Sequence, residues 1–208
     1  MATPDLVLTL ETPSVVLEPL SQEHVDQLLA AASLDRSSYA YTWVPSTVRE
    51  MQDYVAVAEA ERLAGRHLPF VLRRRSDAVV LGTTRFSHLE TFDWPSGHLR
   101  EGRNLPDVVE IGHTWLRADV QGTAVNTEVK VAMVDHAFGV WEVLRVRLCT
   151  DARNLRSRRA IERLGARLDG VLRADRLAAD STIRSTASYT LLADEWPQAR
   201  AALLQRRG

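Results

Sequence analysis

The sequence lacks the features that a disulfide, a signal peptide or a membrane helix would need. It has a single cysteine, Cys149, which excludes an intrachain disulfide. No apolar run approaches the roughly 20 residues of a membrane helix, and residues 1–5 have neither the basic nor the apolar region of a signal peptide. We therefore expect a cytoplasmic protein without a membrane partner. Cys149 lies in an apolar segment, which favours a small buried hydrophobe over a nucleophile.

An excess of charge of either sign is also missing. The 26 basic residues are balanced by 27 acidic ones, which gives a net charge of -1 at pH 7. The molecule as a whole therefore has no electrostatic reason to bind nucleic acid. Lys130 is the only lysine, a bias that runs through the whole sequence and carries no functional information. With 208 residues and 45% hydrophobic side chains, the composition predicts one globular domain over residues 1–208.

Strand and helix patterns alternate along the chain. Apolar, β-forming segments predict about seven strands, at 15–20, 68–74, 79–88, 109–116, 143–149, 166–172 and 182–192. Helices are expected at 25–32, 47–63, 125–138, 151–165 and 194–205. Gly82 indicates a bulge in its strand, 88–106 a long loop, and 173–180 a polar connection. The fold class is therefore α+β, a mixed sheet with helices on both faces.

The most informative stretch runs from Val109 to Gly165. A strand, 109–116, is followed by the small-residue loop Gln121–Ala124 and then by the expected helix at 125–138. Free NH groups and the positive end of a helix dipole meet at such a helix start, so a pyrophosphate could be held there without a charged side chain. A second strand and a second helix follow, and Gly165 ends that helix as its C-cap.

Three pieces of this stretch, in this order, resemble the GNAT family of acyl-CoA N-acyltransferases. They are Glu110–Leu116, Gln121–Ala124, and Asn154–Arg159 closing on 164–166. The similarity is greatest to the RimJ/RimL-like branch, which acetylates N-terminal amines of ribosomal proteins. It implies a GNAT fold with a mostly antiparallel sheet, acetyl-CoA as co-substrate, and direct acetyl transfer to a primary amine in a ternary complex. The acceptor is either a protein N-terminus or a small amine, and no metal is implied.

The resemblance also implies which residues meet the cofactor. They are Trp115, Leu116, Gln121, Gly122, Thr123, Ala124, Val125, Asn126, Thr127, Asn154, Ser157 and Arg159. Asn154 and Ser157 are equally suited to capping the second helix, and the two roles can coexist. The chain departs from the family pattern at Asp119, where the family has Gln or Arg. A carboxylate there should weaken phosphate binding unless it points away.

The family's catalytic roles fall on Glu110 and Ser157. Glu110 resembles the general base, which takes a proton from the incoming ammonium; its alternative is an ordinary surface ion pair. In the resembled branch a serine at the position of Ser157 is the general acid that protonates the departing thiolate. Many other family members use a tyrosine one turn further along, where this chain has Ile161, so the resemblance leaves this role to Ser157. The oxyanion would be met by backbone NH groups near 114–116, where the resembled fold separates two strands.

Four further residues are candidates for binding the acceptor. Tyr39, Tyr41 and Trp43 alternate in a segment that forms part of the acceptor wall in the resembled family, although they could instead cap the core. His113 faces away from Glu110 in an ideal strand, but a bulge would change that. It is either an acceptor-side group or a plain core or surface histidine. The loop at 88–106 is positioned to fold over the acceptor side or to be disordered.

Two other functions remain open at this point. One is a catalytically degenerate module that binds acyl-CoA without turnover. The other uses the ten arginines between Arg145 and Arg176, which could grip nucleic acid phosphates, although basic helix surfaces usually only solvate. A homodimer through the closing strands or the exposed aromatics is a further open alternative.

Overall fold

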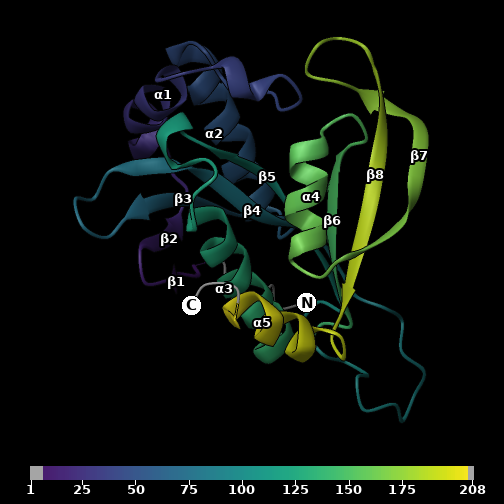
Figure 1. The fold of residues 1–208 in the computed structure, drawn as a ribbon. Coiled ribbons are helices and arrows are strands. Elements are labelled where there is room, and N and C mark those ends of the chain that lie inside the picture. The colour runs from purple at the N-terminus through teal and green to yellow at the C-terminus, as the bar shows by residue number, and fades with distance from the viewer. Residues whose placement is uncertain (1–6, 206–208) are drawn as a thin grey trace.

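A computed structural model describes residues 7–205. The expectation that no signal peptide is present rests on residues 1–5 and lies outside the described residues. The strands are β1 Leu10–Glu11, β2 Val15–Pro19, β3 Leu68–Arg74, β4 Val80–Glu90, β5 Val108–Leu116, β6 Arg145–Asp151, β7 Arg167–Leu177 and β8 Ile183–Leu192. The helices are α1 Val25–Ser33, α2 Val48–Leu63, α3 Val125–Gly139, α4 Leu155–Arg163 and α5 Trp196–Gln205, with short 3₁₀ turns η1 Gln22–His24, η2 Ser37–Tyr39 and η3 Ala118–Val120 (Figure 1).

The strands form one sheet in the order β1-β2-β3-β4-β5-β6-β8-β7. Every neighbouring pair is antiparallel except β5 and β6, which run parallel. The α+β prediction is confirmed, and the sheet has one strand more than the seven expected. The additional strand, β1, is only two residues long, too short to leave a pattern in the sequence.

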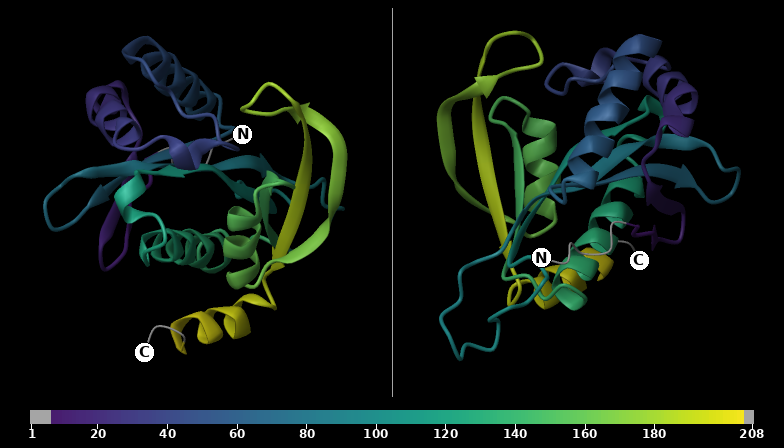
Figure 2. Two further views of the ribbon diagram at one scale, coloured as in Figure 1. Left: turned by 45° about the horizontal axis from the view of Figure 1, so that its top comes forward. Right: turned by 180° about the vertical axis from the view of Figure 1, so that it is seen from behind.

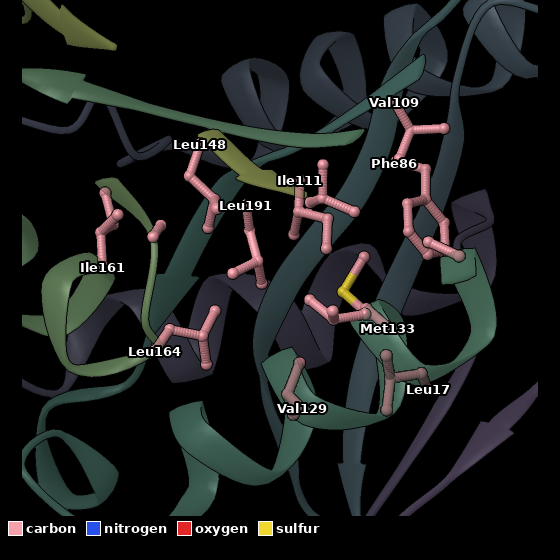
Figure 3. Packing of buried hydrophobic residues seen from close by; sticks show 14 of the residues in the cluster. Leu17, Phe86, Val109, Ile111, Val129, Met133, Leu148, Ile161, Leu164 and Leu191 are labelled. Atoms are coloured by element: carbon pink, nitrogen blue, oxygen red, sulfur yellow. The ribbon is translucent and has the colours of Figure 1, made fainter. Parts of the chain in front are cut away.

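Helices cover both faces of the sheet, as the left panel of Figure 2 shows. Leu28 of α1 and Met51 and Val55 of α2 form one buried cluster with Val71 and Val80 of the sheet. On the opposite face α3 and α4 form the larger cluster. Its members include Leu17, Phe86, Val109, Ile111, Val129, Met133, Leu148, Ile161, Leu164 and Leu191 (Figure 3). Since side chains alternate along a strand, the odd-numbered Val109 and Ile111 face α3, and Glu110 faces the α1–α2 side.

The parallel pair β5–β6 is short and then opens. Only Val108–Glu110 pairs with Arg145–Arg147, while β5 continues to Leu116 and β6 to Asp151 without each other. The two halves of the sheet thus diverge from Glu110 onward, toward the top of Figure 1. Among residues 7–205, the main-chain groups of β5 and β6 along this opening have no strand partner, and this is the separation of strands that the resemblance implied.

Bulges appear on β4 and β5. The β3–β4 register shifts between Val80 and Gly82, which confirms the bulge predicted there. On β5 the register against β4 shifts between Gly112 and Trp115, and His113 has a φ of 50°. A non-glycine residue in this region is uncommon and marks local strain. This second bulge places His113 out of the ideal alternation.

Two sequence expectations about connections need correction. The segment 173–180 is not wholly a polar connection, because β7 continues to Leu177. It is an edge strand, exposed along nearly its whole length, so no burial pattern reveals it. The loop between β4 and β5 is held at the end of the sheet where β5 and β6 begin and pair with each other. Arg100 donates to the carbonyl of Glu142 at 2.9 Å, and Arg103 donates to the carbonyl of Trp141 at 3.0 Å. It lies at the opposite end from the opening and does not cover it (Figure 1, teal).

Candidate active site

The loop before α3 has the form of an anion site. Gly122 adopts a φ of 76°, and a Cβ built there would meet nothing within 4 Å, so the backbone is open to a ligand. Thr123 holds the turn, because its hydroxyl donates to the carbonyl of Val120 at 2.7 Å and accepts from the NH of Val125 at 3.3 Å. The next NH groups, of Asn126 and Thr127, belong to the first helical turn and have no intrahelical acceptor. The residues present therefore fit a pyrophosphate.

The start of α4 supplies a second set of polar groups. Asn154 is the N-cap, and its Oδ1 accepts from the NH of Ser157 at 3.0 Å. This leaves the Asn154 amide NH2 and the Ser157 hydroxyl without a hydrogen-bond partner among residues 7–205. Capping by Asn154 thus uses only one side of its amide, and the remaining donors stay available for a ligand.

A bridge that the sequence did not reveal joins these two regions. Arg156 of α4 donates to Oε1 of Gln121 at 2.6 Å and to the carbonyl of Ser38 in η2 at 3.0 Å. Gln121 in turn donates to the Ser38 hydroxyl at 2.8 Å and to the carbonyl of Leu116 at 2.7 Å. Residues far apart in the chain are therefore fixed around the opening between β5 and β6.

The unfavourable Asp119 is neutralised locally. Its carboxylate accepts from Nε of Arg117 at 2.6 Å, and the pair lies in and next to the short turn η3. A paired carboxylate repels a phosphate far less than a free one. The departure from the family pattern is thus compensated two residues away.

Other arginines near α4 are partly engaged. Arg153 pairs with Asp151 at 2.8 Å and with Asp180 at 3.0 Å, and Arg158 donates to the Tyr189 hydroxyl at 2.8 Å. Arg159 is exposed and makes no ion pair with any residue in 7–205. It is therefore free to meet a phosphate at the surface.

Glu110 lies where β5 and β6 separate. Its side chain is 12% exposed, and Oε2 accepts from Nε of Arg147, the neighbour on β6, at 2.9 Å. Gly112 lies next to the carboxylate, and a Cβ there would come within 3.0 Å of Oε1. Burial raises the pKa of the nearby Cys149 thiol to about 11, and the Glu110 charge adds to the rise. Cys149 is therefore a neutral thiol at pH 7 and no nucleophile.

The β5 bulge turns His113 toward His67, which follows α2, with ring centroids 5.7 Å apart. Burial, followed by the charge of Arg85, lowers the pKa of His113 to about 3 and that of His67 to about 4. His113 is nevertheless exposed as a residue, and solvent screening reduces the size of the shift without reversing its direction. Both imidazoles are therefore neutral at pH 7.

The three predicted aromatics lie in different environments. Tyr39 is only 8% exposed, packs edge-on against Trp115, and donates to the carbonyl of Leu116 at 2.9 Å. Trp43 leans on Tyr54 with centroids 6.1 Å apart. Tyr41 lies beneath the guanidinium of Arg153 at 5.2 Å. Tyr39 and Trp43 line a hollow of about 330 Å³ that also touches Ala179 of the β7–β8 turn.

Trp115 and Leu116 are placed differently from the other predicted cofactor residues. Both side chains are buried, 4% and 7% exposed, and belong to the two core clusters on opposite faces. Any contact with a cofactor would therefore come from their main chain. Over residues 7–205 no cluster of His, Cys, Asp or Glu is arranged for a metal ion. In the same range no helix is both long and apolar enough to cross a bilayer.

Comparison with known proteins agrees with this geometry. The family model described as the acetyltransferase (GNAT) domain matches residues 14–167. The sequence has no significant match among curated proteins.

Solved structures share the fold. A GCN5-related N-acetyltransferase from Brucella melitensis has a TM-score of 0.82 at 24% identity, covering 98% of this chain and 86% of that one. A protein of T. thermophilus assigned as an acetyltransferase has a TM-score of 0.75 at 27% identity, covering 99% and 98%. Mycobacterium smegmatis RimJ, solved with CoA-disulfide, has a TM-score of 0.73 at 23% identity, covering 96% and 93%. Because the family model spans most of the chain, this protein belongs to the GNAT family of N-acetyltransferases, with acetyl-CoA as its acyl donor.

Proposed function

We propose that this enzyme transfers the acetyl group directly to a primary amine in a ternary complex, with Glu110 as general base. The observation that carries the proposal is the position of Glu110 where β5 and β6 separate. Its carboxylate is on the α1–α2 face, while the loop before α3 and the start of α4 lie on the opposite face. An acceptor and a donor entering from opposite faces would meet at this point.

The reaction needs two proton transfers, one from the acceptor amine to Glu110 and one from Ser157 to the leaving sulfur. Arg147 binds Oε2 of Glu110 and fixes its orientation, while Gly112 leaves space beside Oε1. An amine with a pKa near 10 is protonated at pH 7, so Glu110 must take a proton before the nitrogen can attack. Acetyl-CoA supplies the thioester carbon for that attack. Unpaired main-chain NH groups of β5 would face the developing oxyanion, and the Ser157 hydroxyl would protonate the leaving sulfur.

The donor would be held by residues that the sequence already indicated. Gly122, Asn126 and Thr127 would bind the pyrophosphate through NH groups. Asn154 would bind the pantetheine arm with its free amide NH2, and Arg159 would meet an outer phosphate.

The acceptor proposed first is a protein N-terminus. Two structures of similar fold support this acceptor. One is a Vibrio cholerae protein assigned as a ribosomal-protein-serine acetyltransferase, with a TM-score of 0.72 at 16% identity. The other is RimL, the ribosomal L7/L12 α-N-protein acetyltransferase, with a TM-score of 0.73 at 15% identity. A small primary amine is the alternative, because acceptor specificity depends on loops more than on the fold. The hollow lined by Tyr39 and Trp43 is the proposed outer part of the acceptor site.

The test compares Glu110→Gln, Asn154→Ala and an exposed control, Glu90→Gln. Acetyl transfer is followed by release of free thiol over a panel of amines and N-terminal peptides, and acetyl-CoA binding by calorimetry. We expect Glu110→Gln to lower kcat about 10²–10⁴-fold with an unchanged Kd for acetyl-CoA. Asn154→Ala should instead weaken binding. Wild-type turnover by Glu110→Gln from pH 6 to 9 would refute the base assignment, and absence of turnover with every amine would leave only a binding module.

A further inference from the structure

Arg85 is a buried charge that has no ion-pair partner among residues 7–205. It lies in the middle of β4 and is only 4% exposed. It forms no hydrogen bond or ion pair with any side chain in residues 7–205, and its guanidinium lies over the Tyr54 ring at 5.2 Å from the centroid. Its nitrogens are not among the fully sealed atoms, so they reach solvent. Burying an unpaired guanidinium is costly, and such groups are normally paired.

The sheet register places Arg85 on the same face as the proposed base. Arg85 lies opposite Gly112, and Ser87 lies opposite Glu110, on the β4–β5 ladder. Residues directly opposite in an antiparallel pair point to one side, so all four share the α1–α2 face. Two strand residues span about 7 Å, which is the separation along β5 between Glu110 and Gly112, the residue opposite Arg85. Because Gly112 has no side chain, it leaves open the space between the two charged groups. A small ligand could therefore reach both charged groups.

Two carboxylates near Arg85, those of Glu61 and Glu110, are already bound by other arginines. Arg66 binds Glu61 through two hydrogen bonds of 2.6 and 2.9 Å and so lowers its pKa, and the Arg85 charge makes a smaller contribution to the same fall. Glu110 is bound by Arg147 at 2.9 Å. Neither is within ion-pair distance of Arg85.

The two histidines near Arg85 supply no negative charge. His113 and His67 are neutral at pH 7, and the charge of Arg176 also reaches His113. The Ser87 hydroxyl and Nδ1 of His67 are buried without a hydrogen-bond partner. Both atoms are sealed from solvent, so recognition of an anion on this face would fall to the unpaired Arg85 guanidinium, whose nitrogens reach solvent.

We infer that Arg85 binds a carboxylate of the acceptor, so that the substrates are amines that also carry a carboxylate. The guanidinium holds the carboxylate by charge-assisted hydrogen bonds, and Glu110 faces the amine a few atoms away. This inference rests on the proposed acetyl transfer at Glu110. The carboxylate comes either from a free amino acid or from an acidic side chain near a peptide N-terminus, and the guanidinium would recognise both in the same way.

The experiment measures kcat/KM for matched acceptors that differ only in charge. One arm uses amino acids and their amides; the other uses amidated peptides with glutamate or glutamine in the first two positions. Each pair is assayed with wild type, Arg85→Met, Arg85→Lys and the exposed control Arg49→Met. For each enzyme, kcat/KM of the charged acceptor is divided by kcat/KM of its neutral partner. Differences in amine reactivity cancel when this ratio is compared between enzymes.

We expect wild type and Arg49→Met to prefer the carboxylate member of one arm by about 10–100-fold. Arg85→Met should abolish this preference through KM, with neutral acceptors and the Kd of acetyl-CoA changed less than about threefold. Arg85→Lys, which keeps the charge without the fork of donors, should retain part of it and also controls for misfolding. Acetyl transfer by the wild type without a preference for the carboxylate acceptor would overturn this inference alone. An equal loss of kcat/KM for the charged and the neutral acceptor in Arg85→Met would do the same. No transfer to any amine would overturn the proposed function as well.

Discussion

Replacing Lys130 by methionine should stabilise the protein at neutral pH. Lys130 of α3 is 8% exposed, and its Nζ donates to the hydroxyls of Thr114 at 2.7 Å and Thr84 at 3.3 Å. No carboxylate in residues 7–205 forms an ion pair with it. Burial lowers the pKa of this ammonium to about 7, and the charge of Glu110 only partly opposes the fall. The buried, unpaired ammonium therefore lowers the free energy of unfolding.

The size of the effect follows from that pKa. A fall from 10.5 to about 7 corresponds to roughly 4 kcal/mol at pH 7, because each tenfold change in proton affinity is worth about 1.4 kcal/mol. Methionine removes this cost and keeps most of the side-chain volume. It also loses two hydrogen bonds worth about 1 kcal/mol each, although Thr84 and Thr114 remain bonded to each other at 2.8 Å. A net gain of about 2 kcal/mol is expected at pH 7.

The sign of the pH dependence is opposite to that of a paired lysine. Between pH 7 and 10.5 unfolded Lys130 holds its proton while folded Lys130 has released it. The unfolded state then binds more protons, so the stability of the wild type rises with pH. The penalty is complete below pH 7 and vanishes near pH 10.5, and the advantage of Lys130→Met should shrink over that range.

Urea unfolding of wild type and Lys130→Met at pH 6.5, 8 and 9.5 measures this difference. Taking the difference cancels the titration of every other group that the substitution leaves unchanged. The reasoning is refuted if the methionine variant is less stable at pH 6.5. It is equally refuted if the difference in unfolding free energy stays constant up to pH 9.5.

Two further substitutions test the strands around the opening. Gly82→Ala would place a Cβ 2.1 Å from the carbonyl oxygen of Trp115 at a φ of +142°; we expect a loss of about 3 kcal/mol or more, measured by thermal unfolding, and an unchanged Tm would contradict it. Tyr39→Phe removes the hydrogen bond to the carbonyl of Leu116; urea unfolding should show a loss of about 1 kcal/mol, and a loss above about 3 kcal/mol would assign the hydroxyl a larger role.

Much of the fold could be predicted because its signals are local. Thr47 caps α2 by accepting from the NH of Glu50, whose carboxylate returns to the cap, and Gly165 ends α4 at a φ of 97°. Such contacts are made within a few residues, so the sequence shows them directly. The end of β7 was missed because an exposed edge strand buries neither face, and β1 because two residues carry no period.

The candidate site also has features that the sequence shows locally and features that depend on the pairing of distant strands. The loop Gln121–Ala124 and the cap Asn154 are short sequence signals, and the structure places both beside the opening. The isolation of Arg85 and the turn of His113 toward His67 depend on the register between strands and on a bulge. These are set by pairings over many residues, so no single segment of the sequence predicts them.

Within the part of the chain that the structure describes, the divergence of β5 and β6 gives this sheet four free edges, where an ordinary open sheet has two. The outer ones belong to β1 and β7, and the inner ones to β5 and β6 beyond Glu110 and Arg147. Free edges invite pairing with strands of other molecules and so promote aggregation. The inner two narrow to a common point, so a foreign strand could enter only from the wide end. The protein can thus keep unpaired backbone for a ligand while limiting its exposure to edge-to-edge association.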